Sequence, residues 1–262
     1  MSSYIGRHAE LYDIFYADKP YAEEAAFVHQ CLQQYSVGPT RRLLELACGT
    51  GIHALALEKF GYEIIAIDYS EDMLACARRK AAEVASSVDF RWQDMHALDI
   101  AGGPFDAAIC LFDSIGLVKT NEALMQVLRG VRRHVRPDGL FVFEFWHAAA
   151  MLRSYDPVRV RRWSTPEGEL VRVSETELEC AKQLARVTYT IYELRHDGTY
   201  TSLKETQTAR YFLVQEMAGW LSTCGFTPVR WFAGLAPDEN ITEQTWHIVA
   251  AARRCEDSSE VR

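Results

Sequence analysis

Apolar residues recur with two different periods along this chain, and the change of period separates its parts. In residues 40–147, short apolar runs such as "RRLLELACG" and "YEIIAIDYS" alternate with segments in which apolar residues recur every three to four positions. The clearest of these segments, "EALMQVLRGVRRHV", carries a single apolar stripe, as an amphipathic helix does. Strands that alternate with helices predict a parallel sheet with helices on both faces.

Five strands are expected in this region. They lie in "RRLLELACG", "YEIIAIDYS", "VDFRWQDMHAL", "FDAAICLFDSIGLV" and "LFVFEFW". The segment "RPDG" before the last of them predicts a turn. Ser70 stands where a helix N-cap is needed before "EDMLACARRKAAEVA", and Gly61 suits the end of the helix "IHALALEKF".

After residue 150 the segments become longer, rich in Thr and mixed in polarity. Three of them predict an antiparallel β insert at about residues 150–211, and Asp197-Gly198 is a strong signal for a hairpin between the last two. A helix then follows in "VQEMAGWLSTCG". The strands expected in "TPVRWFAG" and "TWHIVAAARR" would close the first sheet as an antiparallel pair.

Composition and charge exclude several classes of function. The 262 residues are 48% hydrophobic with a net charge of −8, which argues against a broad nucleic-acid-binding face. No apolar run approaches the length of a membrane span, and "MSSYIGRHAELYDIFY" lacks the pattern of a signal peptide. The seven cysteines include no C-x-x-C and the eight histidines no H-x-x-x-H. We therefore expect a cytoplasmic protein with no metal site, no membrane contact and no nucleic-acid partner.

The stretch "LLELACGTGIHALAL" at residues 43–57 carries the first chemical signal. Gly49, Gly51 and Ala54 form G-x-G-x-x-A, a spacing found where a dinucleotide pyrophosphate approaches the backbone. Asp68, at the end of the next strand, suits the ribose of any adenosine-type ligand. Glu45 distinguishes the ligands, because a carboxylate repels pyrophosphate and favours a cation such as S-adenosylmethionine. The alternative is that Glu45 pairs with Arg41 or Arg42 at the end of the strand.

Several motifs in one order resemble those of the class I S-adenosylmethionine-dependent methyltransferases. They are "LLELACGTG", "IIAIDYSEDML", "WQDM", "FDAAICLFDSIG" and "RPDGLFVFEF", which cover about residues 40–147. The resemblance implies an α/β fold with a Rossmann-like seven-stranded sheet, helices on both faces, and a last strand that runs antiparallel. It makes two other readings less favoured: an NAD-dependent oxidoreductase and a non-catalytic S-adenosylmethionine binder.

The resemblance also implies which residues bind S-adenosylmethionine and its product S-adenosylhomocysteine. Glu45 and the glycine loop would surround the methionine part, Asp68 the ribose, and Asp94 the adenine, although a lone Asp can instead cap a helix. The full set of expected cofactor-binding residues is Tyr21, Glu45, Ala47, Cys48, Gly49, Gly51, Asp68, Tyr69, Met73, Asp94, Met95, Leu111 and Phe112.

A finer resemblance is to small-molecule methyltransferases, above all the nucleotide-linked aminosugar N,N-dimethyltransferases. It rests on "YDIFYADKPYAEEAAFV", "LFDSIG" and the late β insert. Those enzymes often read "SSIGH", whereas this chain has Asp113 at a serine and Leu117 at the histidine. The resemblance implies a helical lid at residues 1–39, a cofactor-binding core at 40–149 and 212–254, the β insert as a substrate cap at 150–211, and a flexible tail at 255–262.

Methyl transfer needs an aimed, neutral amine, or a hydroxyl with a general base. The expected catalytic residues near the strand ends are Asp113, His147 and Tyr16, and Glu144 is a further candidate base. Each has a structural alternative: Asp113 can cap a helix, His147 can be a satisfied strand-end residue, and Tyr16 can belong to a core stripe. The residues expected to bind the acceptor are Tyr12, Ser114, Trp146 and Tyr211.

The sequence thus predicts a methyltransferase that modifies an amine or a hydroxyl of a small molecule, such as a nucleotide-linked sugar or a natural-product intermediate. O-methylation with a general base is the main rival to N-methylation. The run "RVRRW" either clasps a substrate phosphate or forms a solvated edge of the insert. We expect a monomer or homodimer.

Overall fold

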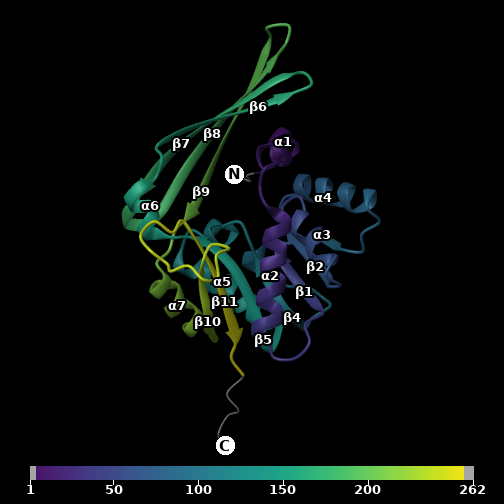
Figure 1. Cartoon of the computed structure of the whole chain (residues 1–262), viewed down its shortest axis with the longest axis vertical. Coiled ribbons are helices and arrows are strands. Elements are labelled where there is room, and N and C mark those ends of the chain that lie inside the picture. Colours follow the sequence, from purple (N-terminus) through teal and green to yellow (C-terminus); the bar gives the residue numbers. More distant parts are fainter. Residues whose placement is uncertain (1–3, 257–262) are drawn as a thin grey trace, which may run out of the picture.

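The computed structural model describes residues 4–256 and contains two sheets (Figure 1). The larger sheet has seven strands in the order β10-β11-β5-β4-β1-β2-β3. Their bounds are β1 Arg42–Leu46, β2 Glu63–Asp68, β3 Asp89–Trp92, β4 Phe105–Cys110, β5 Val135–Trp146, β10 Phe226–Ala233 and β11 His247–Arg254. Strands β1 to β5 pair in parallel, while β11 is antiparallel to both β5 and β10. The expected Rossmann-like seven-stranded sheet is confirmed.

Helices cover both faces of this sheet, as the pattern of apolar residues predicts. Helices α2 (Tyr21–Tyr35), α3 (Ile52–Glu58) and α4 (Glu71–Glu83) pack in one core cluster with alternate strand residues such as Ile109 and Val142. Helices α5 (Asn121–His134) and α7 (Val214–Thr223) pack in another with residues of the opposite parity, such as Cys110 and Phe143. Because successive strand side chains point to opposite faces, each strand feeds both clusters.

Local signals set the ends of these helices. The hydroxyl oxygen of Ser70 accepts the N–H of Met73 at 3.3 Å, which makes it the N-cap of α4 as expected. Gly61 and Gly225 follow α3 and α7 with positive φ angles of 87° and 78°. The α5 stripe of Leu124, Val127, Leu128 and Val131 is fully buried.

The second sheet is antiparallel, with the order β6-β7-β8-β9. Its strands are β6 Val158–Thr165, β7 Gly168–Glu179, β8 Leu184–Arg195 and β9 Tyr200–Arg210. Helix α1 (Arg7–Phe15) lies between this sheet and α4 (Figure 1). Leu11 and Phe15 of α1 pack with Leu170 of β7 and Ile191 of β8. One face of the insert therefore covers the amino-terminal helix.

Three elements differ from the sequence prediction. Strand β6 was not expected, because "VRVRRWST" reads as a charged surface, yet all eight of its residues pair with β7. Helix α6 (Ala148–Ser154) was also missed. The "RPDG" segment is not a separate turn: β5 begins directly after α5, with Asp138 at φ 61° and a register shift opposite, between Phe105 and Ala107. A bulge replaces the expected turn.

The first described residues connect the two sheets. The N–H of Tyr4 donates to Glu205 Oε1 in β9 at 2.9 Å, and the carbonyl oxygen of Tyr4 accepts the hydroxyl of Ser70 at 2.6 Å. The imidazole of His8 lies 2.6 Å from Glu205 Oε2. These contacts tie the start of α1 to the cap on one side and to the core on the other.

Residues 1–3 of the expected lid and 257–262 of the expected tail lie outside the described residues, and the division into lid, core, cap and tail stays a prediction.

Within residues 4–256 no helix combines the length and the apolar character needed to cross a membrane. The same residues contain no group of three or more His, Cys, Asp or Glu side chains placed to hold a metal ion.

Candidate active site

The loop after β1 is built from left-handed backbone. Ala47, Gly49 and Gly51 have φ angles of 50°, 57° and 78°, and α3 begins at the next residue. A Cβ at Gly51 would stand 2.6 Å from the Phe90 ring, so glycine is needed there for packing as well as for conformation. The loop turns sharply at the carboxyl end of β1, where ligands bind in open α/β sheets.

Asp68 holds this loop against the end of β2. Its Oδ2 accepts the N–H of Gly49 at 2.9 Å, and its Oδ1 accepts the N–H of Ser70 at 2.8 Å. Burial raises the pKa of the Asp68 carboxyl, and these two hydrogen bonds oppose that shift without cancelling it. Asp68 lines a cavity of about 100 Å³ together with Ala47, Gly49 and Met73.

Glu45 is a buried acid without a counter-ion. Its side chain is 2% exposed, and Oε2 has no hydrogen-bond partner among the described residues. The alternative of a strand-end ion pair is wrong: Arg42 instead approaches Glu63 at 3.8 Å, and Arg41 forms no ion pair with Glu45 in the described chain. Burial, with a smaller contribution from the charge of Asp68, raises the pKa of Glu45 to about 8. A buried carboxylate of this kind favours the binding of a cationic ligand beside it.

A second, smaller cavity of about 40 Å³ continues from the first. Both are lined by Ala47, Asp68, Tyr69 and Leu117. Asp94 and Met95 lie in the smaller one, at the 3₁₀ helix η1 (Met95–Ala97). Oδ1 of Asp94 accepts the N–H of His96 at 2.9 Å, so this acid caps η1 while it lines the cavity. The expected ligand role and the structural alternative are thus compatible at this residue.

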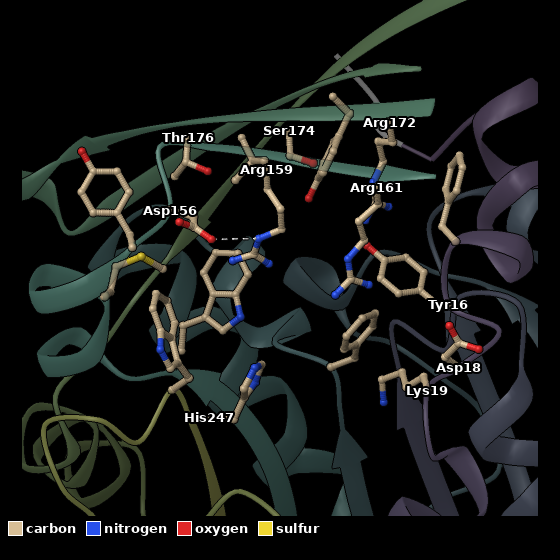
Figure 2. Close-up of a pocket in the computed structure, with 18 of the residues that line it drawn as sticks. Tyr16, Asp18, Lys19, Asp156, Arg159, Arg161, Arg172, Ser174, Thr176 and His247 are labelled. Carbon is tan, nitrogen blue, oxygen red and sulfur yellow. Dashed lines mark ion pairs between the residues drawn. The ribbon is translucent and has the colours of Figure 1, made fainter. Parts of the chain in front are cut away.

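A much larger chamber, of about 790 Å³, lies under the second sheet (Figure 2). It shares five wall residues with the first cavity: Tyr16, Phe112, Trp146, Val187 and Tyr189. The glycine-loop cavities and the chamber therefore meet at one aromatic boundary. Tyr16 and Phe112 meet there edge to face, with ring centroids 4.9 Å apart.

Cationic side chains outnumber acids in this chamber. Its positively charged lining residues are Lys19, Arg159, Arg161, Arg162 and Arg172, against two acids, Asp18 and Asp156. Arg159 lies 3.6 Å from Asp156 (dashed in Figure 2), and Arg162 lies 3.4 Å from Glu169. The remaining positive charge favours an anionic occupant.

Arg172 is the most unusual of these cations. Its side chain is 6% exposed, and its guanidinium lies over the rings of Phe15, Tyr16, Trp163 and Tyr189 at 4.9 to 5.3 Å. Its Nε has no hydrogen-bond partner, and no carboxylate pairs with it among the described residues. Aromatic faces stabilise the charge but leave its N–H donors free for a ligand.

Most of the residues predicted from the sequence converge on these cavities. Those that line at least one of them are Tyr12, Tyr16, Ala47, Gly49, Asp68, Tyr69, Met73, Asp94, Met95, Phe112, Asp113, Ser114 and Trp146. Those that line none of the three are Tyr21, Glu45, Cys48, Gly51, Leu111, His147 and Tyr211. Their predicted roles stay predictions.

His147 and Tyr211 do not face the chamber. His147 is the N-cap residue of α6, and its buried ring places Nδ1 3.1 Å from the carbonyl oxygen of Thr245. Tyr211 is 1% exposed and packs with Ala148 and Met151. In both cases the chain after the strand turns the side chain into the core, which the sequence does not reveal.

Asp113 lines the first cavity but not the chamber, and its backbone is in the left-handed region at φ 56°. It precedes the 3₁₀ helix η2 (Ser114–Leu117) but makes no side-chain cap to it. Its Oδ1 accepts the N–H of Trp146 at 2.7 Å. Burial raises the pKa of Asp113 well above its ordinary value. The carboxyl is therefore held in place and tends to keep its proton.

Sequence reasoning missed His247, Lys19, Arg172 and Tyr189, all of which line the chamber. His247 and Tyr189 lie in strands whose inward and outward positions cannot be told apart without the partner strands. Lys19 follows α1 and stands 4.5 Å from the centre of the Phe112 ring. The run "RVRRW" predicts a cluster of three arginines, which lies on β6, but Arg172 lies on the neighbouring strand β7.

Comparisons with known proteins agree with this geometry. Residues 43–139 match the family model described as a methyltransferase domain. YqeM of Bacillus subtilis (strain 168), whose name gives a methyltransferase and no substrate, is 26% identical over 218 residues, 83% of this chain and 84% of that protein. The dTDP-3-amino-3,6-dideoxy-alpha-D-glucopyranose N,N-dimethyltransferase of Streptomyces fradiae is 35% identical over 148 residues, 55% of each chain.

A solved structure extends the likeness over the whole fold. A methyltransferase from Clostridium acetobutylicum ATCC 824, whose description names S-adenosylmethionine as its donor, superposes with a TM-score of 0.80 at 20% identity. The match covers 94% of this chain and 97% of that one, so the two share a fold that includes the antiparallel insert.

Proposed function

We propose that the chain is an S-adenosylmethionine-dependent methyltransferase and that its acceptor is the amine of a small anionic molecule, of the kind that a nucleotide-linked sugar represents. The observation that carries this proposal is the cationic chamber of about 790 Å³ beside the glycine-loop cavity. Pockets for small molecules have volumes of about 300–1,000 Å³, so the chamber suits an occupant of this size.

The residues at the strand ends fit the methyl donor. The unpartnered acid Glu45 suits its positive methionine end, and the left-handed turn at Gly49 and Gly51 brings the backbone close to a ligand. Asp68 lines the first cavity, where we expect it to bind the ribose hydroxyls, and Asp94 lines the smaller one, where we expect it to bind the adenine. When bound, S-adenosylmethionine supplies an electrophilic methyl group, whose carbon–sulfur bond breaks and leaves its electron pair on sulfur.

The proposal for the acceptor rests on the positive charge of the chamber. Within residues 4–256 no carboxylate pairs with Arg172, and Arg161 lines the chamber from the edge strand β6 (Figure 2). Phosphate groups are bound well by guanidinium groups, which offer several N–H donors in a fixed plane. The relative from Streptomyces fradiae is named for a dTDP-linked aminosugar, which carries both a diphosphate and an amine. A hydroxyl acceptor is the second candidate, and the chamber contains a histidine that serves such chemistry.

We further propose that the protein acts in the cytoplasm, as a monomer or homodimer, on a free small molecule rather than on a nucleic acid. The excess of acidic residues, a net charge of −8, supports the last point.

An acceptor panel tests the proposal. The purified protein is incubated with S-adenosylmethionine and, in separate reactions, dTDP-3-amino-3,6-dideoxyglucose, the same aminosugar without its nucleotide, and dTDP-glucose. S-Adenosylhomocysteine and methylated products are measured by mass spectrometry. We expect turnover of the nucleotide-linked amine and at least 100-fold lower kcat/KM for the free aminosugar. Equal rates with and without the nucleotide would refute an anionic acceptor.

Two variants assign the effect to the chamber. Arg172→Leu and Arg161→Leu should each raise the KM of the nucleotide-linked acceptor about 10- to 100-fold, because a charge-assisted hydrogen bond contributes about 1.5–3 kcal/mol. The affinity for S-adenosylhomocysteine should stay within about twofold. Arg186→Leu is the matched control, since Arg186 is an exposed arginine of β8 that pairs with Glu177 and lines none of the three cavities.

A further inference from the structure

A histidine and a glutamate form a pair at the edge of the acceptor chamber. His247 is the first residue of β11, and its side chain is 41% exposed where it lines the chamber. Its Nδ1 is buried and lies 2.6 Å from Oε1 of Glu144 on the neighbouring strand β5, an ion-pair distance without the angle of a hydrogen bond. Figure 2 shows the His247 ring on the side of the pocket opposite Arg159, Ser174 and Thr176.

The sheet register explains why these two residues meet. His247 is directly opposite Trp146, and Glu144 is opposite Val249, so the pair lies diagonally across antiparallel strands on one face. Both positions are at the end of the sheet where the glycine loop and the cap converge. The pairing therefore depends on β11 running antiparallel to β5.

Glu144 is fixed on its other side as well. Its side chain is 14% exposed, and Oε2 accepts the backbone N–H of Phe112 at 2.8 Å. Burial would raise the pKa of Glu144, but the neighbouring His247 imidazole, Lys19 and the Phe112 N–H outweigh it and lower that pKa. Glu144 thus stays ionised, and it links the histidine to a residue in the wall between the glycine-loop cavity and the chamber.

We propose that His247, oriented by Glu144, is the general base that takes the proton of the methyl acceptor. The inference rests on the proposed function and deepens it. Because Nδ1 faces the carboxylate, Nε2 is the nitrogen left for the acceptor. The proton leaves the acceptor nitrogen or oxygen, whose N–H or O–H bond breaks, and forms a new bond to Nε2. The resulting imidazolium is neutralised by the Glu144 carboxylate, which keeps its charge throughout.

Other groups in the chamber tune this pair without replacing it. Lys19 is the nearest cation to Phe112, and its ammonium is paired with Glu24, which also contacts His53 Nε2 at 2.5 Å. The remaining charged lining groups are Asp18, Asp156, Arg159, Arg161, Arg162 and Arg172.

The other candidate bases are placed less well. Asp113 already accepts the Trp146 N–H through Oδ1, and it lines the first cavity but not the chamber. His147 is buried at the start of α6, outside the chamber. His247 combines an open nitrogen with an orienting carboxylate.

Kinetics on the acceptor that the panel identifies test the proposal in the full-length enzyme. His247→Gln should lower kcat about 100- to 10,000-fold, the usual contribution of a general base, with KM changed less than about threefold. The pH profile of kcat/KM should lose the ionisation that wild type shows on its acid side. Glu144→Gln should lower kcat less than His247→Gln does, because the base remains but loses the carboxylate that orients it. His29→Gln is the control, since His29 lies on α2, contacts the Tyr62 hydroxyl and lines none of the three cavities.

A spectroscopic arm does not depend on turnover. ¹H–¹⁵N correlation spectra of the protein without ligands should show His247 with its proton on Nδ1 and a free Nε2, and Glu144→Gln should weaken that preference. A His247 ring that carries its proton on Nε2 throughout the pH range would overturn the inference, as would a kcat for His247→Gln within threefold of wild type. Failure of the whole acceptor panel would instead count against the proposed function, and the tautomer would still decide the role of the pair.

Discussion

The carboxyl group of Glu45 has opposite effects on two properties. Its ionised form destabilises the ligand-free fold but favours binding of the cationic methyl donor. Substitution by glutamine separates the two effects. Glutamine has nearly the shape of a protonated glutamate but never ionises. Burial raises the pKa of Glu45 from its ordinary 4.5 to about 8 in the ligand-free fold. We therefore expect Glu45→Gln to stabilise the ligand-free protein at neutral and alkaline pH and to weaken its affinity for S-adenosylhomocysteine.

The sign and size of the stability effect follow from proton binding. Below pH 4.5 both the folded and the unfolded chain keep the Glu45 proton, so the carboxyl causes no pH dependence. Between pH 4.5 and 8 the unfolded chain has lost this proton while the folded chain retains it, so the free energy of unfolding falls as pH rises. At about 1.4 kcal/mol per pH unit, the loss reaches about 5 kcal/mol at pH 8 and is constant above it.

Thermal unfolding measured from pH 5 to pH 9 checks this dependence. The stabilisation of Glu45→Gln relative to wild type should grow from near zero at pH 5 to about 3–5 kcal/mol at pH 8. For a chain of this length, about 2–4 °C in Tm accompanies each kcal/mol. Glu63→Gln is the matched control, because Glu63 begins the neighbouring strand with 77% of its side chain exposed. Its substitution should leave Tm within about 1 °C at every pH.

Calorimetry of S-adenosylhomocysteine binding checks the ligand side. The ammonium group of the ligand should drive Glu45 to ionise, so wild type should release close to one proton per ligand at pH 6–7 and almost none above pH 9. In Glu45→Gln this release should disappear, and Kd at pH 8 should rise about 10- to 100-fold. Equal proton release in the two proteins, together with a stability difference that does not vary with pH, would refute the reasoning.

Three further predictions concern the loop, the cap and the lid. Gly51→Ala should lower the free energy of unfolding by about 2–4 kcal/mol in chemical denaturation, because φ is 78° and the new Cβ would meet the Phe90 ring at 2.6 Å; a loss under 1 kcal/mol would show that the loop relaxes. Ser70→Ala should cost about 1 kcal/mol by the same measurement, since it removes the α4 N-cap, and rescue by Ser70→Thr is the check on that cause. Glu205→Gln weakens the contacts to Tyr4 and His8, so dissociation of S-adenosylhomocysteine in stopped flow should become about 3- to 10-fold faster, and an unchanged rate would exclude a lid role for this segment.

Features that depend on neighbours in the chain were predictable. The α5 stripe, the Ser70 cap and the Asp197-Gly198 hairpin depend on residues within a few positions of each other. The same holds for the left-handed turn at Gly49 and Gly51. Short-range periodicity and backbone conformation decide such features, so one sequence carries them in full.

Strand β6 and the bulge of β5 were missed because their signals are not local. The alternation in "VRVRRWST" ends after Val160, and the strand is held by pairing with β7 along its whole length. The bulge at Asp138 arises where β5 contains three more residues than β4 between the pairs Phe105–Val135 and Ala107–Leu140. In both cases hydrogen bonds to another strand outweigh local preference.

The histidines show most clearly what the sequence by itself determined and what only the tertiary structure decided. Sequence order placed the glycine loop, Asp68, Asp94 and Phe112 at strand ends, because parallel strands bring their carboxyl ends to one edge. Sequence order did not distinguish His147 from His247, since each follows a tryptophan, one just after a strand and the other at the start of a strand. Only the antiparallel entry of β11 beside β5 directs His247 toward Glu144 and the chamber, and only the fold of the cap leaves Arg172 among four rings without a carboxylate. Side-chain direction at such positions depends on contacts between residues about 100 positions apart in the chain, which no local pattern records.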